Sequence, residues 1–422
     1  MTHTARSLRI LFLTPQLPYP PHQGTSMRNF YLMAHLARRH QVSLCSFLDA
    51  PLAQTDLGPL AALCQGIEGE PTPTRTLTER LRTTFTSSWP DMGLRLASPA
   101  FHSRLAAWLA REPFDVVEVE GIEMARYGQQ ALAARQGPHP AVVFDDHNAE
   151  YILQQRAYET DRRHPRRWPG ALYSFIQWQK LRRYEAGFCC AADRVAAVSE
   201  ADAQALARLV PGLAPRVVPN GVDVASYRGF TSPADFPPLQ RPALVFTGKM
   251  DFRPNVDGVL WFWQEVWPSI RQAQPTAHFY VVGQRPHTRL APLAADPTVT
   301  VTGLVPDVRP YIAEADAYVI PLRMGGGTRL KVLEAMAMGK GLVSTALGCE
   351  GFPLAPGQHL LVADSPGDFA AATLALLAEP SRREALGQAA QTFAAAHYDW
   401  EAIVPSLEAL LLEAVAEREA RG

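Results

Sequence analysis

Short runs of apolar residues, rich in Val, Ile, Leu and Phe, alternate along the chain with longer segments of helical periodicity. This alternation is typical of parallel sheets whose two faces are covered by helices. In the first half of the chain the runs predict strands at 9–13, 42–47, 116–120, 141–145 and 194–198. In the second half they predict strands at 243–247, 278–282, 299–302, 317–321, 341–345 and 359–362. The pattern therefore predicts two doubly wound, Rossmann-like α/β domains.

The periodicity breaks between Pro219 and Pro242, where PNGVD is followed by a proline-rich stretch. We therefore predict a first domain at 1–220, a linker at 221–242 and a second domain at 243–396. The remaining residues, 397–422, predict a C-terminal helix that can pack back on the first domain. A chain of 422 residues is too long for one ordinary core, which agrees with two domains.

Composition narrows the class of protein. A hydrophobic content of 47% and a charged content of 19% are typical of a globular chain. The net charge of −1 provides no overall attraction to nucleic acid. Five cysteines, with Cys189 and Cys190 adjacent, do not make a disulfide framework, so we expect a reducing, cytoplasmic location. No apolar run approaches the length of a membrane-spanning helix.

The segment 325–346, GGGTRLKVLEAMAMGKGLVSTA, predicts a glycine turn, a helix and a buried strand. Glycines allow close approach to a ligand, and Thr328 is expected to open the helix as its N-cap. Free N–H groups at a helix start favour an anion, whereas Arg329 and Lys331 place positive charge there. These features predict a seat for a phosphorylated ligand. The alternative is a surface helix with a Lys331 to Glu334 pair.

Two further features extend this seat. Glu334 lies roughly 9 Å along the helix from its predicted start, where it can accept hydrogen bonds from the ribose of a nucleoside diphosphate. Gly248 and Lys249 end a predicted strand, and Arg253 and Asn255 follow on the same loop before a helix begins. Open α/β sheets bind ligands at the carboxyl ends of their strands, so we expect Lys249 to meet the same phosphates. The alternative is a solvated loop lysine.

The first half of the chain has two candidate loops. A proline-rich turn leads to Gly24 and Thr25 before a helix with Arg28 in its first turn, which predicts either an anion or sugar loop or a packing turn. The segment VVFDDHNAE, at 142–150, gathers polar groups at a strand end and favours a site in which carboxylates orient His147. We predict no metal, because a supporting ligand cluster and an Asp-x-Asp pair are both absent from the sequence.

Basic and aromatic residues interleave from Arg156 to Arg183. This composition fits a membrane surface or an anionic lipid-linked substrate, although a solvated face on a long helix is the interpretation that the charge pattern favours. Fingerprints of other enzyme classes are missing: GxGxxG after a first strand, GxxxxGK[ST] and GxSxG do not occur.

The blocks FDDHNAEY, AAVSEAD, VVPNGVD, GKMDFRPNVDGVLWF and GGGTRLKVLEAMAMGK give the chain a resemblance to glycosyltransferase family 4. The resemblance extends over nearly the whole chain and is most specific in the last block. Within the family, the chain looks most like the group associated with bacterial exopolysaccharide and exosortase systems. It implies the GT-B fold, in which two Rossmann-like domains face each other across a cleft.

The resemblance also implies roles for individual residues. Glu334 would bind the nucleotide ribose, Lys249 the diphosphate, and His147 would lie near the anomeric carbon. Further donor-binding residues would be Gly248, Arg253, Gly326, Gly327, Thr328, Arg329 and Lys331, and Gly24, Thr25 and Arg28 would form an acceptor or interdomain loop. The chain departs from the family at the Glu-x7-Glu motif, because Gly326 stands at the position of its first glutamate.

The implied activity is that of a retaining hexosyltransferase without metal or cofactor. It would move a sugar from a UDP- or GDP-sugar to a glycan or lipid-linked acceptor in exopolysaccharide biosynthesis, in the cytoplasm or on the cytoplasmic face of the membrane. Two alternatives remain open. One is a sugar-nucleotide epimerase of the same architecture, and the other is a non-catalytic sugar-nucleotide-binding protein, suggested by Gly326.

Overall fold

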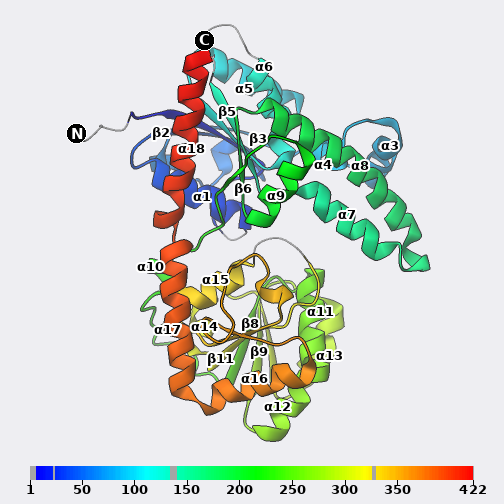
Figure 1. The fold of residues 1–422 in the computed structure, drawn as a ribbon, viewed down its shortest axis with the longest axis vertical. Coiled ribbons are helices and arrows are strands. Elements are labelled where there is room, and N and C mark those ends of the chain that lie inside the picture. The colour runs from blue at the N-terminus through cyan, green and yellow to red at the C-terminus, as the bar shows by residue number, and fades with distance from the viewer. Residues whose placement is uncertain (1–5, 22–23, 134–139, 326–328, 422) are drawn as a thin grey trace. The chain divides into compact units, whose positions relative to one another are not determined.

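The computed structural model describes residues 6–21, 24–133, 140–325 and 329–421, and Figure 1 shows the fold. Contacts divide the chain into two compact units. Unit 1 comprises the chain up to Asn220 together with the C-terminal segment from Ile403, and unit 2 is Gly221–Ala402. Each unit is built around its own parallel sheet.

The sheet of unit 1 has seven strands in the order β3-β2-β1-β4-β5-β6-β7. The chain reverses its direction of winding between β1 and β4, and this is where open α/β sheets bind ligands. All five predicted strands are confirmed, whereas β3 and β7 were not predicted. β3 is a half-exposed edge strand with the sequence CQGIEGEP, and β7 has only two residues, so neither shows an apolar run. The strands are β1 Arg9–Thr14, β2 Gln41–Leu48, β3 Cys64–Pro71, β4 Val116–Glu120, β5 Ala141–Asp146, β6 Arg194–Ala197 and β7 Arg216–Val217.

Helices cover both faces of this sheet (Figure 1). The basic segment that was predicted as one long helix forms two helices, α7 and α8, which pack along each other. Among the described residues, no helix is both long enough and apolar enough to span a bilayer. The helices are α1 Gly24–Leu36, α2 Leu60–Leu63, α3 Leu77–Thr86, α4 Asp91–Arg95, α5 Pro99–Arg111, α6 Ala125–Ala133, α7 Glu150–Asp161, α8 Trp168–Ala191 and α9 Glu200–Leu209.

The C-terminal helix α18, Trp400–Arg421, contributes most of its length to unit 1. Its Glu408 accepts a hydrogen bond from Arg39 and lies 2.9 Å from His40 Nε2, and its Glu413 pairs with Arg216 at 2.8 Å. Polar contacts therefore join the end of the chain to the region of β2 and β7.

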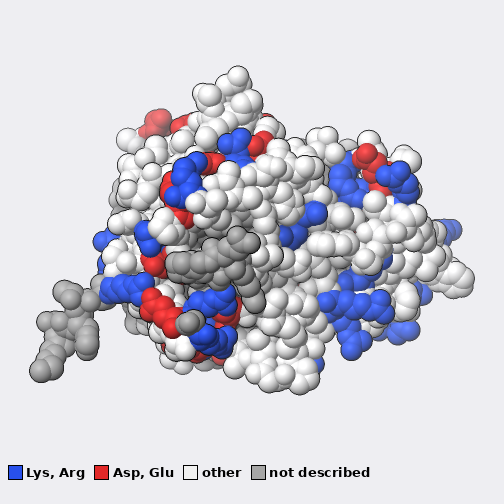
Figure 2. Space-filling view, turned by 90° about the horizontal axis from the view of Figure 1, so that it is seen from above, with Lys and Arg blue, Asp and Glu red and all other residues white. Residues whose placement is uncertain are grey.

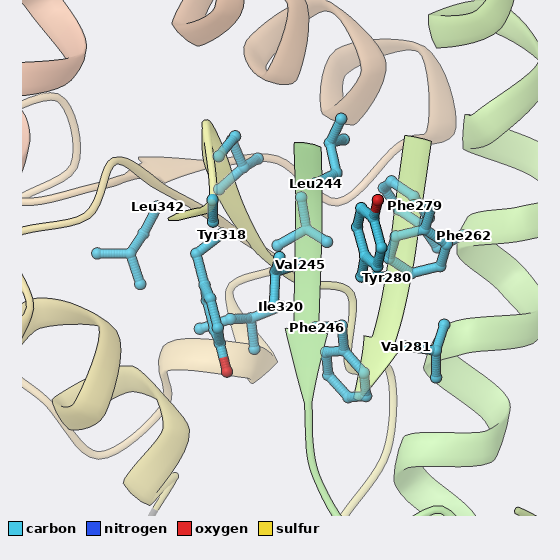
Figure 3. Packing of buried hydrophobic residues seen from close by; sticks show 14 of the residues in the cluster. Leu244, Val245, Phe246, Phe262, Phe279, Tyr280, Val281, Tyr318, Ile320 and Leu342 are labelled. Carbon is cyan, nitrogen blue, oxygen red and sulfur yellow. The ribbon is translucent and has the colours of Figure 1, made fainter. Parts of the chain in front are cut away.

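The sheet of unit 2 has six strands in the order β10-β9-β8-β11-β12-β13, with its switch point between β8 and β11. All six predicted strands are confirmed, with ends that shift by one or two residues. Figure 3 shows side chains of β8, β9 and β11 in the core, with Phe279 and Tyr280 next to Phe262 and with Tyr318 on the other side of β8. The strands are β8 Ala243–Thr247, β9 His278–Val282, β10 Val299–Gly303, β11 Ala317–Ile320, β12 Leu342–Ser344 and β13 Leu361–Val362.

Part of the segment predicted as a linker belongs to the core of unit 2. Val222 and Val224 pack against Leu333 and Ala337, and Val222 N donates to Tyr398 O at 2.8 Å. The helices of this unit are α10 Val224–Tyr227, α11 Arg253–Trp261, α12 Trp267–Ala273, α13 Ala291–Ala294, α14 Arg309–Glu314, α15 Leu330–Ala337, α16 Pro366–Ala378 and α17 Pro380–His397, with a π-helical segment, Phe262–Val266, between α11 and α12.

Candidate functional site

The carboxyl end of β8 is in close backbone contact with the end of β9 and the loop that follows it. Gly248 N donates to Val282 O at 3.0 Å, and a Cβ added to Gly283 would lie only 1.8 Å from Gly248 O. Both glycines have positive φ, 156° and 148°. Only glycine fits where the two backbones approach so closely, and this contact fixes the backbone next to Lys249. The side chain of Lys249 is exposed at the end of the strand.

Lys331 of α15 reaches this same strand end. Its Nζ donates to Asn255 Oδ1 at 2.8 Å and lies 4.1 Å from the centre of the Phe246 ring. Asn255 in turn donates from Nδ2 to Lys249 O at 2.9 Å. Asn255, which was expected on the same loop as Arg253 but was given no ligand-binding role, is buried here in the first turn of α11. Asn255 therefore connects the two predicted phosphate-binding lysines.

Burial sets the protonation of this group. Burial lowers the pKa of Lys331 to about 7, although the negative charge of Glu334 acts in the opposite direction and raises this pKa. Burial also raises the pKa of Glu334, whereas Lys331 lowers it. An anion bound beside Lys331 would stabilise its charged form. The arrangement thus favours a negatively charged ligand at the end of β8.

The alternative of a surface pair between Lys331 and Glu334 is not what the structure shows. In the described part of the chain the two side chains do not form an ion pair within 4.0 Å. Lys331 turns to Asn255, and Glu334 Oε1 accepts a hydrogen bond from Tyr227 OH at 3.3 Å. Both ends of the predicted ribose and phosphate site are therefore held by partners from outside α15.

One local prediction at the start of α15 is wrong. The helix begins at Leu330 and its N-cap is Arg329, not Thr328. Arg329 is buried and takes the non-helical backbone angles φ −89° and ψ 74°, so the helix starts after it. Arg253 is exposed and opens α11. Three predicted donor-binding residues lie outside the described residues: Gly326, Gly327 and Thr328.

In unit 1 the register of two central strands brings carboxylates together. β4 and β5 pair Glu120 with Asp145, and both side chains are fully buried. Arg28 binds Asp145 through Nε at 2.8 Å and Nη2 at 3.0 Å, and its Nη1 donates to Pro219 O at 3.1 Å. The helix α1 begins at Gly24 itself. Arg28, predicted to serve a ligand loop, is thus buried as the counter-ion of Asp145.

His147 follows β5 and is oriented by Glu120. His147 Nε2 lies 2.7 Å from Glu120 Oε2, and the amide nitrogen of Asn29 donates to the same oxygen at 2.8 Å and to Thr25 O at 3.2 Å. Burial lowers the pKa of His147, but the hydrogen bond and charge of Glu120 outweigh it and raise the pKa overall. A Cβ on Gly121 would lie 3.6 Å from His147 Nδ1, so the second ring nitrogen faces backbone that carries no side chain.

In unit 1 the fold brings together three side chains that could hold a metal ion, which the sequence did not predict. Ligand atoms of Glu120, Asp145 and His147 lie within 4.8 Å of one another. The sequence could not show this group, since Glu120 is on a different strand from the other two. Because Arg28 already donates three hydrogen bonds to Asp145, a cation would have to compete with the guanidinium.

Two family models match consecutive parts of the chain. The model described as Glycosyltransferase Family 4 matches residues 23–226, and the model described as Glycosyl transferases group 1 matches residues 241–379. The chain belongs to glycosyltransferase family 4. The family that the sequence blocks implied is thereby confirmed.

Solved structures of the family's fold cover almost the whole chain. Sucrose-phosphate synthase from Thermosynechococcus elongatus is 19% identical with a TM-score of 0.68 and covers 98% of this chain and 100% of its own. HepE of Anabaena, in complex with UDP, is 15% identical with a TM-score of 0.65 and covers 96% and 100%. These similarities show the fold, which is GT-B with two Rossmann-like domains.

A curated relative matches part of the chain. It is a GDP-mannose-dependent monoacylated alpha-(1-6)-phosphatidylinositol monomannoside mannosyltransferase from Corynebacterium glutamicum, 26% identical over 204 residues. The match covers 44% of this chain, and the chain spans about half, 52%, of the length of that relative.

Proposed function

We propose that this family 4 protein transfers a sugar, with retention, from a nucleoside-diphosphate sugar to a glycan or lipid-linked acceptor. The observation that carries the proposal is the group at the end of β8, where Lys331 and the backbone of Lys249 share one partner, Asn255. A cation whose pKa is lowered by burial is stabilised when a diphosphate binds beside it. Family membership supports the same activity.

The chemistry requires stabilisation of a departing diphosphate, whose negative charge grows as the bond to the sugar breaks. Lys249, Lys331 and Arg329 supply positive charge near the start of α15, without need of a metal. Glu334 is held by Tyr227 in a position to accept hydrogen bonds from ribose hydroxyls. In the proposed assignment these residues bind the nucleotide and stabilise the leaving group.

The acceptor oxygen forms a bond to the anomeric carbon on the face from which the nucleoside diphosphate leaves, and the bond between that carbon and the phosphate oxygen breaks. The acceptor proton passes to a phosphate oxygen, so no protein nucleophile is involved. His147, fixed by Glu120, contributes by positioning a sugar hydroxyl with the ring nitrogen that Glu120 does not engage.

The donor, cellular role and location belong to the same proposal. A UDP- or GDP-sugar is favoured, because the HepE structure contains UDP and the curated relative is named as GDP-mannose-dependent. We place the activity in exopolysaccharide biosynthesis on the cytoplasmic side, with peripheral membrane contact through residues 156–183.

Thermal unfolding with UDP, GDP and ADP and their sugars tests the nucleotide site, since a ligand of the folded state stabilises it by about 2.7 kcal/mol at one hundred times its Kd. One nucleotide should raise the melting temperature, and Lys249→Ala should reduce the effect. Arg382→Ala, which removes an exposed arginine of α17, is the matched control. A failure of all three nucleotides to bind would contradict the proposal.

The reaction is tested with the donor that binds. Incubation without acceptor identifies an epimerase, because epimerisation proceeds without one. Donor hydrolysis or transfer that is lost in Lys249→Ala would exclude a non-catalytic binding protein. With acceptor, NMR of the product should show the same anomeric configuration as in the donor. An inverted anomer would overturn the retaining mechanism.

A further inference from the structure

Unit 1 contains a pocket of about 590 Å³ that the proposed donor chemistry does not use. Its walls come from the loop before α3 and from α3, α4, α7 and α8. Three arginines line it together with a single carboxylate, Asp91, so the lining carries excess positive charge. The arginines are Arg75, Arg80 and Arg95.

Hydrogen bonds fix two of these arginines. Asp91 accepts from Arg75 Nη1 at 2.7 Å and from Arg80 Nε at 3.1 Å. Tyr173 OH donates to Asp91 Oδ2 at 3.3 Å, and Gln177 Oε1 accepts from Asp91 N at 2.7 Å. The third, Arg95, pairs with Glu123 at 3.4 Å, so two carboxylates face three guanidinium groups and one positive charge is left over. Guanidinium groups match the geometry of phosphate oxygens, so the pocket suits an anionic phosphate group.

The two helices that flank the pocket also expose apolar side chains. Among the described residues, six of the eight exposed large hydrophobic side chains lie on α3 and α8. Leu77, Leu81 and Phe85 are spaced by four residues and so share one face of α3, with Leu77 69% and Phe85 70% exposed. The others are Trp168, Leu172 and Phe175 of α8. Exposed apolar clusters of this kind mark contact surfaces.

Charge complements this surface. Residues 156–183 contain eight Lys or Arg residues and two Asp or Glu residues, whereas the whole chain has a net charge of −1. The far right of Figure 2, where α7 and α8 project in Figure 1, is correspondingly rich in Lys and Arg. Such a basic region attracts anionic lipid, worth roughly 1 kcal/mol for each cation close to an anionic membrane surface.

We propose that the pocket binds the phosphate head group of an amphiphile whose apolar part lies along α3 and α8, and that this amphiphile is the acceptor. The assignment as acceptor rests on the proposed function, whereas the binding site does not. A phosphate-bearing lipid accounts for the three observations together: the arginine pocket, the apolar residues beside it and the basic helix pair. A free phosphate would use the pocket alone.

Binding is measured by titration calorimetry with dihexanoyl phosphatidic acid below its critical micelle concentration, with inorganic phosphate and with dihexanoyl phosphatidylcholine. Phosphatidic acid should bind more tightly than phosphate, and phosphatidylcholine should bind weakest. The double variant Arg80→Gln/Arg95→Gln should weaken binding of phosphatidic acid at least about tenfold, since each hydrogen bond to a charged group contributes a factor of this order. Arg111→Gln, on α5, is the control for loss of an exposed arginine.

A second double variant separates the contribution of the lipid head group from that of the acyl chains. Leu77→Ser/Phe85→Ser should weaken binding of phosphatidic acid and leave binding of inorganic phosphate unchanged. Equal loss in Arg111→Gln and in the double arginine variant, or equal affinity for the two lipids, would overturn the proposal. Thermal unfolding of each variant with and without nucleotide verifies that the fold and the donor site are intact.

Vesicles of phosphatidylcholine with and without phosphatidylglycerol distinguish binding through the pocket from general contact with the bilayer. Anionic vesicles should bind, and Arg80→Gln/Arg95→Gln should reduce that binding. If vesicle binding is the same in the arginine variant, the contact is with the bilayer alone and the pocket assignment fails. Lipid binding without any sugar transfer would instead refute the proposed function and the assignment as acceptor, while the binding site would stand.

Discussion

Lys331 Nζ lies 2.8 Å from Asn255 Oδ1, although the two residues are 76 positions apart in the chain. This contact joins α15 to the first turn of α11, and it holds a lysine whose pKa is lowered by burial to about 7. A buried amine with that pKa is partly neutral at physiological pH. Binding of a ligand that favours the charged form is therefore linked to the uptake of a proton by Lys331.

The first prediction is that UDP or GDP binding takes up a proton above pH 7. A bound diphosphate raises the pKa of Lys331 above its value of about 7 in the unliganded protein, so affinity is fullest below pH 7 and falls as the pH rises from about 7 toward 9. One linked proton limits the fall to about tenfold per pH unit. Calorimetry at pH 8 in buffers of different ionisation enthalpy measures the proton directly.

Lys331→Arg is the control for this linkage, because a guanidinium remains charged throughout this pH range. Its affinity should vary little between pH 7 and pH 9. An equally steep fall in Lys331→Arg would assign the proton to another group and contradict the prediction.

The second prediction concerns Glu120 and His147 in unit 1. Burial lowers the pKa of His147, whereas the hydrogen bond to Glu120 and its charge raise it more. Glu120→Gln keeps the shape and removes the charge, so the pKa of His147 should fall. An NMR titration of the imidazole resonances measures the shift, with His35 as an internal reference in α1. An unchanged pKa of His147 would show that Glu120 does not set its protonation.

How far the sequence predicts this molecule depends on whether the signal is local. Apolar runs such as 243–247 identified the buried strands, because strands covered on both faces are apolar along their length. β3 was missed since an edge strand needs no such run. The positions of Lys249 and His147 at strand ends follow from the order of elements alone.

Contacts between residues far apart in the chain leave no local signal in the sequence. The Asn255 to Lys331 contact and the side-by-side placement of Glu120 and Asp145 depend on which strands are neighbours and on their register. Arg28 illustrates the consequence. The sequence shows a cation near a loop, and only the packing of α1 on the sheet shows that this cation is paired with Asp145. Without an alignment or a structure, such pairs carry no local signature.

The third prediction is that Glu118 lowers stability at neutral pH. Its side chain is fully buried, and within the described residues neither carboxylate oxygen has a hydrogen-bond partner. Burial, reinforced by the charges of Glu120 and Asp145, raises the pKa of Glu118. The raised pKa means that its contribution to stability is fully present below the unfolded value, near pH 4.3, and is lost as the pH rises through the folded pKa.

Glu118→Gln removes this titration. Urea denaturation should therefore show the variant to be more stable than the wild type at pH 8, with a difference that shrinks toward pH 4. Glu112→Gln, at a solvent-accessible glutamate of the same unit, should show no such trend. A variant that is less stable at pH 8 would mean that the Glu118 carboxylate has an essential charged role.

The fourth prediction concerns the crossing of the two loops at the donor site. In Gly283→Ala the new Cβ would lie 1.8 Å from Gly248 O, at a residue whose φ is 148°. Backbone strain of about 1–3 kcal/mol adds to an overlap that only a backbone shift can relieve, itself about 1–3 kcal/mol. We expect the free energy of unfolding to fall by roughly 2–6 kcal/mol, measured by urea denaturation.

Two other glycines separate strain from overlap. Gly351 has φ 92° but open space around its Cα, so Gly351→Ala should cost only the strain, about 1–3 kcal/mol. Gly187 lies within α8 with no atom near the added Cβ, so Gly187→Ala should stabilise by up to about 1 kcal/mol through helix propensity. Because the Gly283 overlap displaces the backbone next to Lys249, Gly283→Ala should also weaken nucleotide binding, whereas Gly351→Ala and Gly187→Ala should not. Equal nucleotide affinity in all three variants would show that this crossing does not position the donor site.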